Sequence, residues 1–133
     1  MRLPNWRSAL RDYVEDVARK PFRYGTHDCA LFVAGAVKAM TGVDHARGWR
    51  SQYRSLAKGQ KLLAAKGHQD HVALVASLFE EIPVLRAQVG DIAVLDGDGG
   101  EALGVVQGPY VWAADPHGLR SVPLIQAKMA FRV

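Results

Sequence analysis

The chain has 133 residues, a formal net charge of +4, 49% hydrophobic residues and 23% charged residues, which is ordinary for a globular domain that needs no disulfide or metal to hold its core. Its one cysteine excludes an internal disulfide and fits a reducing compartment. No apolar run approaches the ~18 residues of a membrane span, and the N-terminal segment lacks the apolar core of a signal peptide, so we expect neither a membrane span nor standard export.

The first two helices are predicted from their caps and their apolar spacing. One begins at Asn5, a favourable cap, and is closed by Pro21. The other begins at Asp28, also a favourable cap, and stops at Gly42. Both segments place apolar residues at helical intervals: Trp6, Leu10, Tyr13, Val14 and Val17 in the first, and Phe32, Val33, Ala36, Val37 and Met40 in the second.

The polar middle of the chain predicts two short helices near residues 50–57 and 60–65, and the run at 71–82 predicts another that ends before Pro83. The glycine-rich residues 96–101 predict a hairpin turn. Short β-rich runs separated by Gly, Asp and Pro follow Pro83, as in antiparallel hairpins: residues 90–95, 102–106, 110–114, 119–124 and 130–133.

Helices followed by strands predict an α+β fold in a single domain of residues 1–133. The N-terminal helical part, about residues 5–82, is expected to pack on one face of a small antiparallel C-terminal sheet, about residues 88–133.

Cys29 lies at the predicted start of the second helix. Free backbone N–H groups and the positive end of the helix dipole favour a thiolate there, which predicts a lowered pKa, and the same N–H groups suit an oxyanion. A free cysteine is also among the most buried residue types. The position therefore leaves two interpretations open, a reactive nucleophile and a packing residue.

The residues around Cys29 form a recognisable pattern: aromatic residues at Phe22 and Tyr24, then Gly25, then the pair Asp28 and Cys29 at a helix start. This pattern resembles the nucleophile segment of the NlpC/P60 papain-like superfamily, although Phe22 stands where that superfamily usually has Tyr. The segment VGDIAVL resembles the superfamily's Gly-Asp strand, and ALGVVQG resembles its next strand. The resemblance implies a papain-like fold with Cys29 as the candidate nucleophile.

The segments HDCALFVA and GDIAVL and the terminal FRV resemble, more narrowly, a small phage-associated family of unknown function within that superfamily. Its members tend to be encoded among tail genes, often where a tail-tip peptidase would be expected. The resemblance therefore implies a tail-associated protein. It also makes Tyr24, Asp28 and Trp112 candidate binding residues, with Asp28 alternatively a simple cap and Trp112 facing either the core or the cleft.

The resemblance also marks a departure, because the superfamily's catalytic His corresponds to Ala102 here. The third polar residue, which orients that His, would lie near Trp112 and Ala113, where the chain is apolar. General acid–base help is worth roughly 10²–10⁴-fold in rate, so we expect a catalytically degenerate site. His27, two residues before Cys29, and His117, in a predicted turn, are the candidate substitute bases.

Two further groups of residues suggest binding. His68, Asp70 and His71 lack a fourth ligand and standard spacing for zinc, so we expect no metal and no cofactor. Residues 47–66 contain six cations and no acid, which indicates either a solvated face or a surface for an anionic partner. No nucleic-acid motif accompanies them, so nucleic acid is not the expected partner.

The sequence thus predicts a phage or prophage tail-associated protein with a degenerate NlpC/P60-like domain, acting in tail-tip assembly or cell-envelope contact. Its expected location is the virion tail or the host cytoplasm. Its expected partners are other tail or virion proteins, with a peptidoglycan peptide as the candidate ligand. One alternative is an active cysteine peptidase or amidase that cuts peptidoglycan stem peptides, using Cys29 with His27 or His117. The other is a basic adaptor that binds an acidic protein or nucleic acid through residues 47–66.

Overall fold

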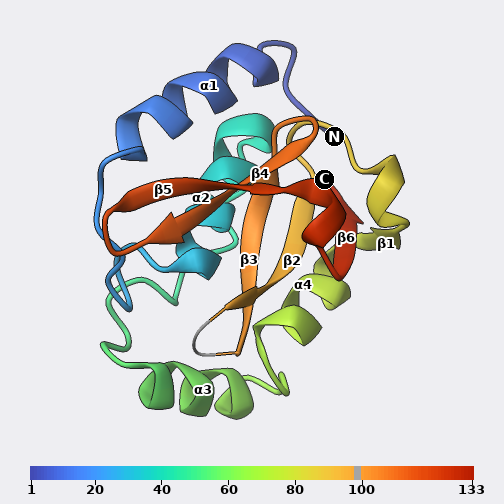
Figure 1. The fold of residues 1–133 in the computed structure, drawn as a ribbon. Helices are drawn as coiled ribbons and strands as arrows, with labels where there is room; N and C mark the ends of the chain where they lie inside the picture. Colours follow the sequence, from blue (N-terminus) through green and yellow to red (C-terminus); the bar gives the residue numbers. More distant parts are fainter. Residues whose placement is uncertain (98–99) are drawn as a thin grey trace.

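A computed structural model describes residues 1–97 and 100–133 (Figure 1). The hairpin turn predicted at residues 96–101 includes residues 98 and 99, which lie outside this description. The described residues form four α-helices, six strands and two short 3₁₀-helices: α1 Trp6–Val17, α2 Cys29–Thr41, α3 Leu56–Ala65, α4 His71–Leu78, β1 Glu80–Ile82, η1 Val84–Arg86, β2 Ile92–Gly97, β3 Gly100–Val106, β4 Tyr110–Asp115, β5 Gly118–Pro123, η2 Leu124–Gln126 and β6 Met129–Arg132. In this part of the chain, no helix combines the length and apolar character needed to cross a membrane.

Helix α2 has the two ends that the sequence predicts. The Asp28 side chain accepts a hydrogen bond from the backbone N–H of Leu31 at 2.9 Å, which satisfies one free donor at the helix start. At the other end Gly42 has a φ of 81°, a left-handed conformation that glycine adopts without strain. Helix α1 also begins after Asn5, but the Asn5 side chain makes no capping hydrogen bond.

The middle of the chain differs from its prediction. Residues 50–55 form turns instead of a helix, and one helix, α3, replaces the two that were expected. The Ser55 side chain accepts from the backbone N–H of Lys58 at 3.2 Å and so begins α3. The hydroxyl of Ser55 therefore decides the start, whereas the apolar spacing used for the prediction did not include it.

The helix predicted at residues 71–82 is also too long. Helix α4 ends at Leu78, and Glu80–Ile82 forms the edge strand β1, which pairs with β6 near the end of the chain. Pro83 disfavours the helical conformation in the residue before it. The distant β6 then supplies the hydrogen-bonding partner that turns this segment into a strand.

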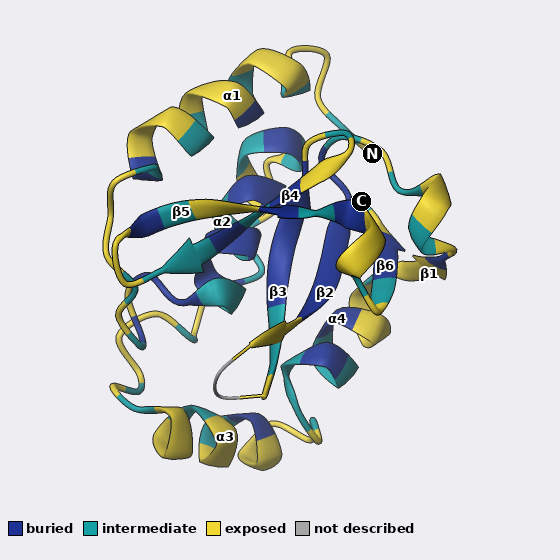
Figure 2. Cartoon of the chain, viewed as in Figure 1, coloured by how far each residue is buried: buried dark blue, intermediate teal, exposed yellow. Residues whose placement is uncertain are grey.

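The six strands form one antiparallel sheet in the order β1-β6-β2-β3-β4-β5. One face lies under the helices, where Ile92, Val94, Leu103 and Phe131 join α1, α2 and α4 in the main core. The other face forms a second core with the 3₁₀-helices, centred on Leu95, Val106, Val111, Val122 and Leu124. Figure 2 shows the buried residues along β2 and β3 between these layers. The α+β prediction, with helices on one face of an antiparallel sheet, is confirmed.

Candidate functional site

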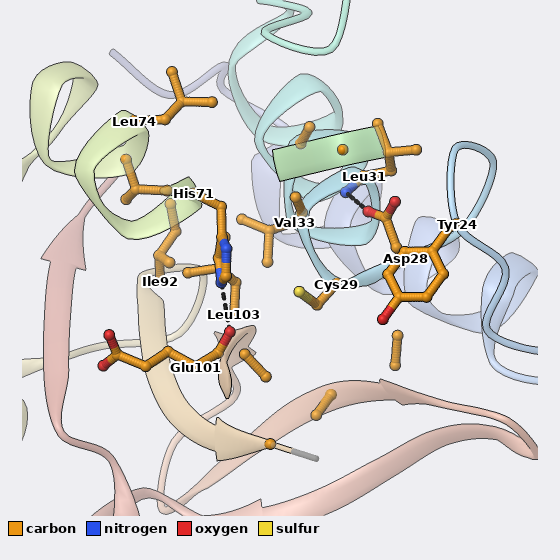
Figure 3. Close-up of a pocket in the computed structure, with 18 of the residues that line it drawn as sticks. Tyr24, Asp28, Cys29, Leu31, Val33, His71, Leu74, Ile92, Glu101 and Leu103 are labelled. Carbon is orange, nitrogen blue, oxygen red and sulfur yellow. Dashed lines mark hydrogen bonds between the residues drawn. The ribbon is translucent and has the colours of Figure 1, made fainter. Parts of the chain in front are cut away.

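Cys29 is the first residue of α2 and opens on a cleft with a volume of about 650 Å³. Side chains from α2, α3, α4, β2, β3 and β4 line this cleft, and most of them are apolar (Figure 3). The size falls within the 300–1,000 Å³ range of ordinary ligand sites. The cleft is therefore the candidate functional site of the chain.

Asp28 anchors the wall of the cleft beside Cys29. Its side chain is 3% exposed, and besides capping α2 it accepts hydrogen bonds from the Gly25 N–H at 3.1 Å and from the Tyr53 hydroxyl. Gly25 has a φ of 85°, and a Cβ atom there would lie 1.9 Å from the Tyr53 carbonyl oxygen, so only glycine fits. Tyr53 ties the loop before α3 to the start of α2. No local pattern predicts this hydrogen bond, because Tyr53 and Asp28 are 25 residues apart along the chain.

The Cys29 thiol is harder to ionise than the helix start alone predicts. Burial, with a smaller contribution from Asp28, raises the pKa of Cys29 to about 11. The backbone of Leu103, Ala30 and Cys29 itself lowers the pKa, as the expected N–H groups should, but burial outweighs these hydrogen bonds. The helix start favours a thiolate only where neighbours leave the sulfur open to water, and here burial in the cleft raises the pKa instead.

The sheet presents apolar side chains to Cys29. Leu103 belongs to the core under the helices, and side chains alternate along a strand, so the Ala102 side chain points to the opposite face of β3. The register thus moves the position facing Cys29 from Ala102 to Leu103. On β4, Trp112 and Ala114 face the helices, whereas Ala113 joins the second core. Leu103 and Ala114 therefore face Cys29 with side chains that cannot exchange a proton, and the cleft acids on the same strands, Glu101 and Asp115, pair with Lys128 and Arg120.

Neither histidine predicted as a substitute base lines the cleft. His27 is 7% exposed, its ring lies edge-on to Phe32 at 6.0 Å, and its Nε2 has no partner in the described structure. Burial and Lys20 lower the pKa of His27. His117 is exposed on the turn between β4 and β5, where its N–H bonds the Asp115 side chain. The fold therefore leaves both residues out of the cleft lining.

Two other histidines, His45 and His71, do line the cleft. His71 is the first residue of α4, and its Nε2 hydrogen-bonds the backbone carbonyl of Glu101 on β3 (Figure 3). The sequence prediction considered His71 only as a metal ligand with His68 and Asp70. Asp70 instead caps α4 by accepting from the Ala73 N–H at 2.7 Å. Within the described residues, no three His, Cys, Asp or Glu side chains gather as a metal site requires.

The two aromatic residues predicted to bind ligand have different positions. Tyr24 lines the cleft, and burial raises its pKa, with Cys29 and Asp28 adding to the rise. Trp112 packs against the core under the helices and is not part of the cleft lining. Tyr24 and Asp28 thus keep their predicted place, and Trp112 acts as a packing residue.

The comparison with protein families gives one match. The family described as "Domain of unknown function (DUF6950)" matches residues 1–133. The chain belongs to this family. No curated protein matches the chain. The description of the family names no activity, so the geometry of the cleft must carry the argument about function.

Residues 47–66, the basic segment, lie beside the cleft, on α3 and in the loop before it. Arg50 pairs with Asp44 at 2.8 Å, and the Lys66 ammonium lies over the Trp49 ring at 4.7 Å. Four further cations of the segment are exposed and form no ion pair within the described residues: Arg47, Arg54, Lys58 and Lys61. These four are the surface that the basic-adaptor alternative requires.

Proposed function

We propose that this protein is a phage or prophage tail-associated protein whose papain-like, NlpC/P60-related cleft binds a cell-envelope peptide without cutting it. It acts during tail-tip assembly or contact with the cell envelope, and its partners are other tail proteins. The observation that carries the proposal is the setting of Cys29. The cysteine stands at the start of α2 and opens on a ligand-sized cleft, but Leu103 and Ala114 face it from the sheet.

The setting supports binding over cleavage for an energetic reason. A cysteine peptidase needs a thiolate, a base that takes the thiol proton and an acid that protonates the leaving amine. General acid–base help is worth roughly 3–5 kcal/mol of barrier. The raised pKa of Cys29 adds to the barrier, since roughly one thiol in ten thousand is ionised at pH 7 when the pKa is about 11. The cleft volume of about 650 Å³ lies within the range of ordinary ligand sites, which supports binding.

Purified peptidoglycan fragments test the proposal directly. We expect calorimetry to detect binding of a disaccharide-tetrapeptide, and mass spectrometry to detect no cleavage after prolonged incubation. Cys29→Ala should bind equally well, because the thiol is not needed to hold the ligand. Absence of binding in wild-type protein would contradict the envelope ligand. Mass spectrometry of intact virions, with the chain among the tail proteins, tests the tail role separately.

A cysteine peptidase or amidase is the second candidate, and His71 is the observation that favours it. His71 lines the same cleft as Cys29 and leaves one ring nitrogen free of the Glu101 carbonyl. In this scheme His71 takes the thiol proton, the sulfur attacks the peptide carbonyl carbon, and the C–N bond breaks as the proton passes to the leaving amine. Water then hydrolyses the resulting thioester, which releases the acid and returns the proton to Cys29. Cleavage by wild-type protein that Cys29→Ala and His71→Ala each abolish would establish this candidate in place of the first.

A further inference from the structure

The edge of β3 that faces the cleft is free of β4. The ladder between β3 and β4 extends from Val106 only to the pair of Gly104 and Ala113. The N–H and the carbonyl of Val106 both bond toward β2, to Asp91 and Gly90. Because backbone groups alternate in direction along a strand, those of Glu101 and Leu103 point toward β4. Beyond the end of the ladder, these groups need other partners.

Two side chains of the cleft supply those partners. His71 bonds the Glu101 carbonyl, and a backbone hydrogen bond from Leu103 lowers the pKa of Cys29. A bond that favours the thiolate is donated to the sulfur, so it comes from the Leu103 N–H. Glu101 and Leu103 are two residues apart, roughly 7 Å along a strand. The thiol and the imidazole therefore meet the same short stretch of β3 from α2 and α4.

The bond to Glu101 fixes which nitrogen of His71 carries the proton. A carbonyl oxygen only accepts hydrogen bonds, so Nε2 must donate and the neutral ring keeps its lone pair on Nδ1. Nδ1 has no partner within the described residues and is not among the buried unsatisfied atoms. It is therefore an accessible acceptor in a cleft whose lining is mostly apolar.

The remaining polar groups of the lining narrow the ligand class. Its acids are already partnered: Asp28 holds Tyr53, Glu101 pairs with Lys128 at 3.4 Å, and Asp115 pairs with Arg120 at 3.5 Å. Asp96 shares Lys128, so each of the four acids in the described lining already has a partner. The Tyr24 hydroxyl has no hydrogen-bond partner among the described residues. The polar groups left free in the described part of the lining include the His71 Nδ1 acceptor, the Tyr24 hydroxyl, the His45 ring and the Gln60 amide.

We propose that His71 is the recognition residue of the cleft, and that its Nδ1 accepts a hydrogen bond from the amide N–H of a peptide with apolar side chains. The Tyr24 hydroxyl donates to a carbonyl of the same peptide. An amide is the group that offers an N–H and a C=O together between apolar parts, as this lining requires. The inference rests on the proposed function, because it names the chemistry by which the cleft selects a peptide.

The test compares two probes on matched histidine variants. The probes are the disaccharide-tetrapeptide and an acetyl-dipeptide amide with two apolar side chains, each titrated by calorimetry. We expect His71→Ala to weaken both by about tenfold, the effect of one net hydrogen bond. His71→Gln should retain most of the affinity, since its amide can donate to Glu101 and still offer an acceptor. The control is His68→Ala, because the His68 ring lies beside Trp49 and is not part of the cleft lining. This variant should bind both probes as the wild-type protein does.

The outcomes separate this inference from the proposed function. Equal binding by wild-type and folded His71→Ala overturns the inference and leaves the proposed function standing. Binding of the dipeptide amide alone, lost in His71→Ala, keeps the inference and overturns the envelope ligand. Binding of neither probe overturns both. Ring ¹⁵N chemical shifts give a readout without ligand: we expect the proton on Nε2, and a proton on Nδ1 overturns the inference even if His71→Ala fails to fold.

Discussion

Two buried carboxylates hold this fold, and their partners differ in kind. Asp28 is 3% exposed and is held by neutral groups, two backbone N–H groups and the Tyr53 hydroxyl. Asp91 is 1% exposed and is held by cations: Arg2 donates to it at 3.0 Å, and Arg132 lies 3.8 Å away. It also accepts backbone N–H groups of Gln88 and Val133, at 2.9 and 3.1 Å.

The two carboxylates connect different parts of the molecule. Asp91 connects the second residue of the chain with the last two, so it closes the domain at its termini. Asp28 connects the start of α2 with the loop before α3, so it closes the cleft beside Cys29. We call the ion-pair network of Asp91 the clamp and the hydrogen bond between Tyr53 and Asp28 the tie. The tie costs less free energy to break than the clamp, because it is a single hydrogen bond from a neutral hydroxyl.

Asp91→Ala should have the largest effect on stability. Removing one partner from a buried ion-pair network costs about 3–5 kcal/mol, and two backbone N–H groups would also lose their acceptor. Urea denaturation should detect this loss as a lower midpoint. Asp12→Ala is the control, because Asp12 is exposed and should change stability by less than about 0.5 kcal/mol. A loss below about 1 kcal/mol for Asp91→Ala would show that the clamp is dispensable.

Asp28→Ala should cost less, about 2–3 kcal/mol, since it removes a helix cap of about 1 kcal/mol and two further neutral hydrogen bonds. The same urea experiment measures it. Peptide binding should also weaken in this variant but not in the remote Arg132→Ala, because only Asp28 lines the cleft. Equal loss of binding in both variants would contradict the division between clamp and cleft.

Tyr53→Phe sharpens the comparison, because it removes only the hydroxyl that reaches Asp28. We expect a global cost of about 1 kcal/mol and faster amide hydrogen exchange in α3, where Leu63 is the only buried residue. Tyr110→Phe is the matched control, since Tyr110 is 46% exposed and makes no side-chain hydrogen bond in the described structure. Unchanged exchange in α3 would mean that the tie does not hold this helix.

The smallest effect is expected for Cys29 itself. Cys29→Ala should cost about 1 kcal/mol, the usual scale for a small truncation. Iodoacetamide should label Cys29 slowly at pH 7 and faster as the pH rises toward its pKa of about 11. Mass spectrometry follows the labelling, and the urea-unfolded chain gives the rate of a free cysteine. Labelling of the folded protein as fast as the unfolded chain at pH 7 would contradict the raised pKa.

Local signals predicted much of the fold. Asp28 caps α2 through a residue three positions away, and Gly42 ends the helix with its own backbone conformation, so both are visible in a single short segment. The five strands after Pro83 followed from β-rich runs and turn residues in the same way. The missed strand β1 depends on β6, about fifty residues away, and no local pattern reveals that pairing.

The sequence by itself therefore determined most of the elements, the position of Cys29 at a helix start and the two ends of α2, because these depend on residues within one turn of each other. Only the tertiary structure decided the chemistry of the cleft. Tyr53 reaches Asp28 across 25 residues, and His71 reaches the Glu101 carbonyl across 30. Packing of the helices on the sheet also buries the Cys29 sulfur, so the pKa rises although the helix start alone predicts a fall. Contacts between distant segments, and the water they exclude, set the properties that a local reading of the chain cannot supply.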